Sequence, residues 1–168
     1  MAGLIPGMES IIAISTILAA LFGIFVFWGI LTGVFYLISS LFKGKGTFKR
    51  TLEFIGYGYL PQILGVILTI IVAMQYIPRV IVPEISSVAS QDPQVIQDAV
   101  KALMHDPVMM EMTQIISIIS IVFLLWSANI WIFGMRNARQ LSERDSALCV
   151  GIPVVVYIIY IIYTMTGI

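Results

Sequence analysis

Four long runs of apolar residues, separated by short polar segments, set the organisation of this chain. The first extends from residue 10 to residue 42 without one charged side chain, and the other three runs also contain no charged residue. Because a helix rises about 1.5 Å per residue and the hydrocarbon core of a bilayer is about 30 Å thick, about 20 apolar residues suffice to cross it. The pattern predicts spans at about 16–42, 51–76, 112–135 and 145–165.

Glycine, proline and polar caps predict where the first two helices end, begin and bend. Gly44 and Gly46 interrupt the apolar run, and Thr47 is a candidate N-cap for the second helix. We expect this second helix to continue to about residue 76 as one element, with a kink at Pro61, because proline removes a helical hydrogen bond.

Similar signals predict the limits of the last two long helices. Asp106 followed by proline is typical of a helix start, with the acid as N-cap. Ser142 and Asp145 have the spacing of a capping box at the start of the fourth helix. Pro153 predicts a kink within that helix.

Residues 93–104 predict a shorter, amphipathic helix outside the hydrocarbon. Asp92 followed by proline supplies a start signal, and the segment is too short and too charged to span a bilayer. Asp98 and Lys101 fall off its apolar stripe. We expect that stripe to pack against the outer ends of the first and third long helices, or to lie in the membrane interface. Its members are Val95, Ile96, Val100 and Leu103.

The distribution of positive charge predicts the topology. Of nine Lys and Arg residues, seven lie in two short loops: Lys43, Lys45, Lys49, Arg50, Arg136, Arg139 and Arg144. The long connection between the second and third spans carries mostly acidic residues instead. The positive-inside rule therefore predicts two cytoplasmic basic loops, and both termini are expected on the extracytoplasmic side.

Composition agrees with a membrane protein and argues against several other classes. The chain is 60% hydrophobic and 11% charged, whereas soluble domains are about half apolar and about a quarter charged. The net charge is zero and no basic stripe is present, so nucleic acid is not an expected partner. We predict an all-α polytopic membrane protein with four spans in two hairpins, plus the extracytoplasmic amphipathic helix.

The four apolar runs contain no Asp, Glu, Lys, Arg or His that a proton relay or membrane hydrolase would need at mid-depth. The lone His105 cannot by itself supply the three or four ligands of a metal site. Ser142 and Cys149 have no histidine on their side of the membrane, so no catalytic pair forms. We therefore expect no enzymatic activity, no catalytic residues, no cofactor and no metal.

Uncharged polar residues inside the helices are candidates for a different role. Gln62, Ser127 and Asn129 form a candidate polar pocket, although hydrogen bonds between helices are the ordinary use of such side chains. Gly29 and Gly33 form a GxxxG pair, which serves either packing within one chain or a homodimer face.

Three motifs occur in order along the chain. The first joins a basic loop to a glycine- and tyrosine-rich helix start, the second closes the third span, and the third lies in the fourth span. Their residues are Gly56, Tyr57, Gly58, Tyr59 and Pro61, then Gly134, Arg136, Asn137, Ala138 and Arg139, then Gly151 and Pro153. Together these motifs resemble the Yip (Ypt-interacting protein) family of small polytopic membrane proteins.

The resemblance implies five spans and a cytosolic N-terminus in typical members, with eukaryotic relatives that bind Rab-type small GTPases in vesicle traffic. Here four spans are predicted, as if the first span were missing, and the simple loops are similar to those of prokaryotic members. The resemblance favours an integral protein of a prokaryotic cell membrane. The expected partners are membrane lipids, other membrane proteins or a small GTPase-like protein, and, through the GxxxG pair, a second copy of the chain.

Two functions follow from these patterns. The first is a non-enzymatic membrane scaffold or adaptor of the Yip family, linked to membrane organisation or trafficking. The alternative is a small transporter, channel or lipid-handling protein that uses the uncharged polar pocket at Gln62, Ser127 and Asn129.

Overall fold

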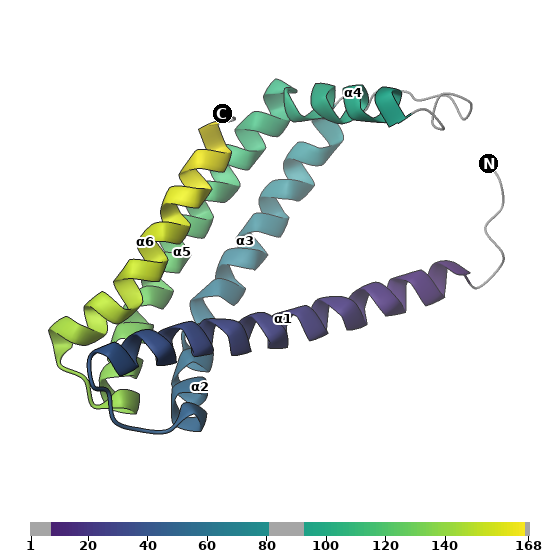
Figure 1. Ribbon diagram of the computed structural model, residues 1–168. Coiled ribbons are helices and arrows are strands. Elements are labelled where there is room, and N and C mark those ends of the chain that lie inside the picture. Colours follow the sequence, from purple (N-terminus) through teal and green to yellow (C-terminus); the bar gives the residue numbers. More distant parts are fainter. Residues whose placement is uncertain (1–7, 81–92, 167–168) are drawn as a thin grey trace. The chain divides into compact units, whose positions relative to one another are not determined.

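A computed structural model describes residues 8–80 and 93–166 of the chain (Figure 1). Every regular element in these ranges is helical, and they contain no β-strand. The elements in order are α1 (Met8–Leu41), α2 (Phe48–Tyr57), α3 (Leu60–Tyr76), the 3₁₀ turn η1 (Ile77–Arg79), α4 (Pro93–Met104), α5 (Pro107–Arg139) and α6 (Glu143–Thr166). Asp92, the predicted cap of α4, lies outside the described residues.

Four stretches of the described chain are long and apolar enough to cross a membrane: Ser10–Leu41, Phe48–Arg79, Pro107–Arg139 and Glu143–Met165. Their outward faces carry many exposed isoleucine, leucine, valine and phenylalanine side chains, as expected for surfaces in contact with lipid. The predicted all-α polytopic membrane protein is therefore confirmed.

The second span differs from the single kinked helix that the sequence predicts. A turn at Gly58 and Tyr59 separates α2 from α3, so the span consists of two helices. Pro61 occupies the first turn of α3, where its missing N–H is not needed for a helical hydrogen bond. Pro153, in contrast, lies inside α6, and that helix continues through it.

The chain divides into two compact units. The first unit contains Met1–Tyr57 and Trp131–Val150, and the second contains Gly58–Ile130 and Gly151–Ile168. In the first unit, α1, α2 and the ends of α5 and α6 surround a small core whose members are almost completely buried. They are Phe35, Ile55, Trp131, Met135, Cys149 and Val150.

In the second unit, α3 packs antiparallel to α5. Gln62 is hydrogen-bonded to Ser127, and Tyr76 donates a hydrogen bond from its hydroxyl to Glu111 over 2.9 Å. Between these pairs, the backbone of Gly65 comes so close to α5 that an added Cβ would lie 3.0 Å from the ring of Phe123. Contacts therefore bind the two helices at three levels.

Helix α4 has the predicted bounds, but protein leaves most of its apolar stripe uncovered, and only Leu103 is half-buried. No described residue of α4 is buried. Val95, Ile96 and Val100 are 37%, 43% and 45% exposed. Of the two expectations for this stripe, packing of the whole stripe against other helices is therefore not seen in the described residues.

Candidate functional site

The most elaborate polar arrangement of the first unit is centred on Arg139, in the last turn of α5. Its side chain is only 3% exposed. The guanidinium donates hydrogen bonds to the hydroxyls of Ser39 (2.8 Å) and Ser40 (3.3 Å) and to the carbonyl oxygens of Gly44 (2.8 Å) and Gly46. These partners lie at the end of α1 and in the loop that follows it. Arg139 thus joins the two basic loops of the chain.

The acceptors of Arg139 are all neutral, so its positive charge is stabilised by dipoles and not by an opposite charge. The ring of Tyr36 adds a further contribution, because the guanidinium carbon lies 4.1 Å from its centroid. Arginine suits this position, since its planar fork can satisfy several acceptors at once and stack on an aromatic face. We call Arg139 and its five partners, Tyr36, Ser39, Ser40, Gly44 and Gly46, the arginine clamp.

The backbone of the loop is shaped to fit this clamp. The N–H of Lys45 donates to the carbonyl oxygen of Arg139 over 2.7 Å, so the loop is also held through its main chain. Gly46 has a φ of +129°, a conformation that only glycine adopts readily. A Cβ at Gly46 would also collide with the carbonyl oxygen of Ala138. The glycine between the lysine and the cap of α2 is therefore required by geometry.

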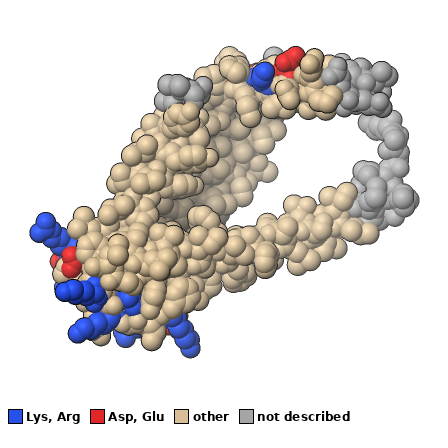
Figure 2. Space-filling model, viewed as in Figure 1, with Lys and Arg blue, Asp and Glu red and all other residues tan. Residues whose placement is uncertain are grey.

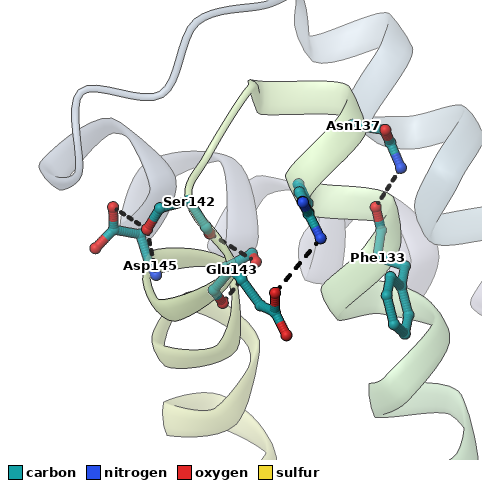
Figure 3. A network of polar contacts seen from close by, with 7 residues as sticks. Phe133, Asn137, Ser142, Glu143 and Asp145 are labelled. Atoms are coloured by element: carbon teal, nitrogen blue, oxygen red, sulfur yellow. Dashed lines mark hydrogen bonds and ion pairs between the residues drawn. The ribbon is translucent and has the colours of Figure 1, made fainter.

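Local caps complete the two loops. The hydroxyl of Thr47 accepts a hydrogen bond from the N–H of Arg50 over 3.3 Å, which confirms the predicted cap of α2. Ser142 accepts from the N–H of Asp145 over 3.1 Å and donates to its carboxylate over 2.7 Å (Figure 3). The predicted Ser142–Asp145 capping pair is therefore confirmed at the start of α6.

Indole groups hold α2 in place from two sides. Trp28 of α1 donates to the carbonyl oxygen of Leu52 over 3.1 Å, and Trp131 of α5 donates to that of Ile55 over 2.8 Å. Two motif glycines permit this close packing. A Cβ at Gly56 would lie 3.2 Å from the ring of Trp28, and a Cβ at Gly134 would lie 3.2 Å from the Cβ of Phe54.

Six of the seven loop cations remain at the surface around the arginine clamp. Figure 2 shows Lys and Arg side chains gathered where the turns of the first unit lie. The exposed members are Lys43, Lys45, Lys49, Arg50, Arg136 and Arg144. Arg136 forms an exposed ion pair with Glu143 over 3.5 Å. We call these six residues the basic surface; the clamp fixes the loops that carry it.

The predicted polar pocket is only partly assembled. Gln62 donates from its amide nitrogen to the buried hydroxyl of Ser127 over 3.1 Å, so these two side chains are brought together. Asn129 is exposed and is not on the buried side of α5 that carries Ser127. The contact between Gln62 and Ser127 is an ordinary hydrogen bond between helices. Among the described residues, no group of three or more His, Cys, Asp or Glu residues could hold a metal.

The other motif residues lie in different surroundings. Tyr57 and Asn137 are exposed, and Asn137 donates to the carbonyl oxygen of Phe133 one turn earlier in α5. Gly58 and Pro61 are buried. At Gly151 an added Cβ would meet no described atom within 4 Å, so the structure gives no packing reason for that glycine.

The sequence pattern groups Arg139 with the other loop cations and does not predict its burial. The pattern also does not single out Tyr36, Ser39 and Ser40, which supply the ring and two of the acceptors. One signal is present: two adjacent serines lie near the end of a mostly apolar helix, just before a loop with two glycines. That combination provides hydroxyls and accessible carbonyl groups close together.

These features define a small helical membrane protein in which two short basic loops are joined into one ordered structure. The chain belongs to the Yip family: the model of the Yip1 domain matches residues 1–165. It is also 44% identical over 71 residues to an uncharacterized protein of Methanocaldococcus jannaschii. That match covers 40% of this chain and half the length of the archaeal protein, and it agrees with a prokaryotic member. No solved structure matches the chain.

Proposed function

We propose that this protein is a non-enzymatic membrane scaffold or adaptor that presents the basic surface to an acidic partner protein. The observation that carries the proposal is the arginine clamp. A buried guanidinium, 3% exposed, fixes the loop between α1 and α2 to the turn between α5 and α6. This arrangement lets six exposed cations from two loops act as one surface of defined shape.

Preorganised loops favour recognition, because less conformational entropy is lost when a partner binds. Complementary charge increases the association rate and selects against partners of the wrong sign. We infer that the basic surface faces the cytoplasm of a prokaryotic cell, since the positive-inside rule places such loops there. Within the family resemblance, a small GTPase-like protein or another membrane protein is the partner class to test first.

The alternative of a transporter or channel receives less support from the contacts. Gln62 and Ser127 use each other as partners, and Asn129 is exposed away from them. The amide and hydroxyl are then engaged with each other and not presented to a ligand. We therefore give preference to the scaffold.

The test compares two double variants that remove the same kind of charge from different places. Lys49→Gln with Arg50→Gln alters the basic surface, and Arg50 lies over the ring of Phe54. Lys101→Gln with Arg79→Gln is the matched control, because it also removes one lysine and one arginine that lies over a ring. Each protein is crosslinked in native membranes, purified, and its crosslinked partners are identified and quantified.

We expect wild type and the control pair to capture the same acidic partner, and the Lys49/Arg50 variant to capture at least fivefold less. High salt should reduce capture in the same way, since exposed charges are screened. Equal capture by both double variants would contradict the proposal, as would a captured partner without an acidic surface.

A further inference from the structure

Helix α4 has an almost ideal separation of polar and apolar side chains. With about 3.6 residues per turn, successive side chains are about 100° apart. Its polar side chains after Pro93 then fall within an arc of about 100°, while the remaining arc is apolar throughout. The polar members are Gln94, Gln97, Asp98 and Lys101. The apolar members are Val95, Ile96, Ala99, Val100, Ala102, Leu103 and Met104.

Most of this apolar arc has no protein cover, and only Ala99 and Leu103 are half-buried. None of the described residues of α4 is buried, and Met104, at the end of the arc, is 68% exposed. Exposing the apolar face of a twelve-residue helix to water is unfavourable, so other apolar groups are expected to cover this face.

The direction of α4 points to the membrane surface. Figure 1 shows α4 turning sharply away from α5, to which it is joined through His105 and Asp106, both belonging to the second unit. Because α5 crosses the membrane, a helix that turns away from it at its end lies along the surface and not through the bilayer. Asp106 fixes the corner, since its carboxylate accepts hydrogen bonds from the N–H groups of Val108 and Met109 over 2.8 and 3.1 Å.

The height of α4 along α5 agrees with the headgroup layer. Glu111 is hydrogen-bonded to Tyr76, and Arg79 lies over the ring of that tyrosine, so a polar and aromatic layer marks the ends of α3 and α5. Asp106 precedes Glu111 by five residues, or about 7 Å of helix. Interfacial helices lie at this level, with the apolar face about 5–10 Å into the boundary of the acyl chains.

We propose that α4 is an interfacial helix whose apolar arc is covered by lipid. Lipid is the occupant that the position favours, because the exposed apolar surface of α5 already meets lipid and α4 continues from it. The charges of Asp98 and Lys101 cancel, so the binding is carried by apolar contact and does not require anionic lipid. This inference is independent of the proposed scaffold function.

The test uses nitroxide spin labels on the full chain in phosphatidylcholine vesicles. Cys149 is buried and donates to the carbonyl oxygen of Phe35, so Cys149→Ser retains a donor while removing the native thiol. Single cysteines then replace Ile96 and Val100 on the apolar arc, or Gln97 and Lys101 on the polar arc. Power saturation measures the accessibility of each label to oxygen, which concentrates in lipid, and to a water-soluble nickel chelate.

For each label we take the ratio of its accessibility to oxygen to its accessibility to the nickel chelate. We expect this ratio to be at least threefold higher at residues 96 and 100 than at residues 97 and 101. Dominance of the nickel chelate at all four positions would overturn the proposal, because α4 would then lie in water. Low accessibility to both reagents at residues 96 and 100 would also overturn it, since protein and not lipid would cover the arc. A contrast that appears only when phosphatidylglycerol is added would refute the claim that apolar contact carries the binding.

Discussion

Replacing Arg139 with alanine tests whether the arginine clamp holds the first unit together. The substitution removes four hydrogen bonds from a buried cation and the contact with Tyr36. Hydrogen bonds to a charged group contribute about 1.5–3 kcal/mol each, but bonds within one network do not add. Because the acceptors are neutral, the substitution leaves no unpaired charge, but each buried acceptor that stays unsatisfied costs about 1–3 kcal/mol. Because Ser40 is exposed, water can replace part of the lost bonding, so we expect about 3 kcal/mol.

The matched control is Arg136→Ala, one turn earlier in the same helix. Arg136 pairs with Glu143 at 3.5 Å, but the two side chains are 50% and 77% exposed. Exposed ion pairs contribute at most about 1 kcal/mol, so this variant should retain nearly all stability. Arg139→Lys should have a stability between those of the wild type and Arg139→Ala. Its ammonium group keeps the positive charge but cannot form the planar fork, and it stacks less well on an aromatic ring.

The assay is equilibrium unfolding in mixed micelles with increasing sodium dodecyl sulfate, followed by tryptophan fluorescence. Trp28 and Trp131 both lie in the first unit and donate to backbone carbonyl groups of α2, so they report on its packing. A loss of about 3 kcal/mol changes the folding equilibrium by more than 100-fold. If Arg139→Ala loses no more stability than Arg136→Ala, the clamp does not stabilise the fold, and the reasoning from its buried hydrogen bonds is refuted.

Three further predictions concern packing and topology. Gly46→Ala should lower the free energy of unfolding by about 1–3 kcal/mol, because a side chain is disfavoured at its φ of +129°. The control is Gly23→Ala on α1, which should not lower that free energy, because an added Cβ there would lie in open space. Gly65→Leu should separate α3 from α5 and lower the unfolding midpoint in the same assay, because its Cβ would already touch an aromatic ring. In a cysteine-free background, a cysteine at Lys45 should be labelled only from the cytoplasm and one at Lys101 only from outside; the reverse pattern would contradict the positive-inside assignment.

Sequence alone predicted those features that depend on neighbouring residues. The cap at Thr47, the cap at Ser142 and the start of α5 at Pro107 each follow from two or three adjacent positions. The bounds of α4 were also predicted, because a periodic apolar pattern between a proline and an aspartate determines them. Such signals act over one helical turn, and no distant contact is needed to interpret them.

Features that depend on distant contacts were not predicted. Arg139 and Ser39 are 100 positions apart in the chain, and nothing in the local sequence distinguishes Arg139 from its exposed neighbour Arg136. Asn129 fails for a different reason, which is local: it is grouped with Ser127 because both are polar and close in sequence. On a helix, two residues two positions apart point in directions about 200° apart, so one is exposed when the other is buried.

The break in the second span and the position of Trp131 explain each other. The last carbonyl groups of any helix lack a partner within that helix, and a helix that ends inside a membrane must satisfy them with other protein groups. Ile55 lies in the last turn of α2, and its carbonyl oxygen accepts from the indole of Trp131 over 2.8 Å. Trp131 is itself 3% exposed, so its N–H also needs a partner. Helix α2 can therefore end before Gly58 because the indole N–H of Trp131 satisfies the carbonyl oxygen of Ile55. The buried indole is satisfied in turn, because the end of α2 leaves that carbonyl oxygen free to accept its hydrogen bond.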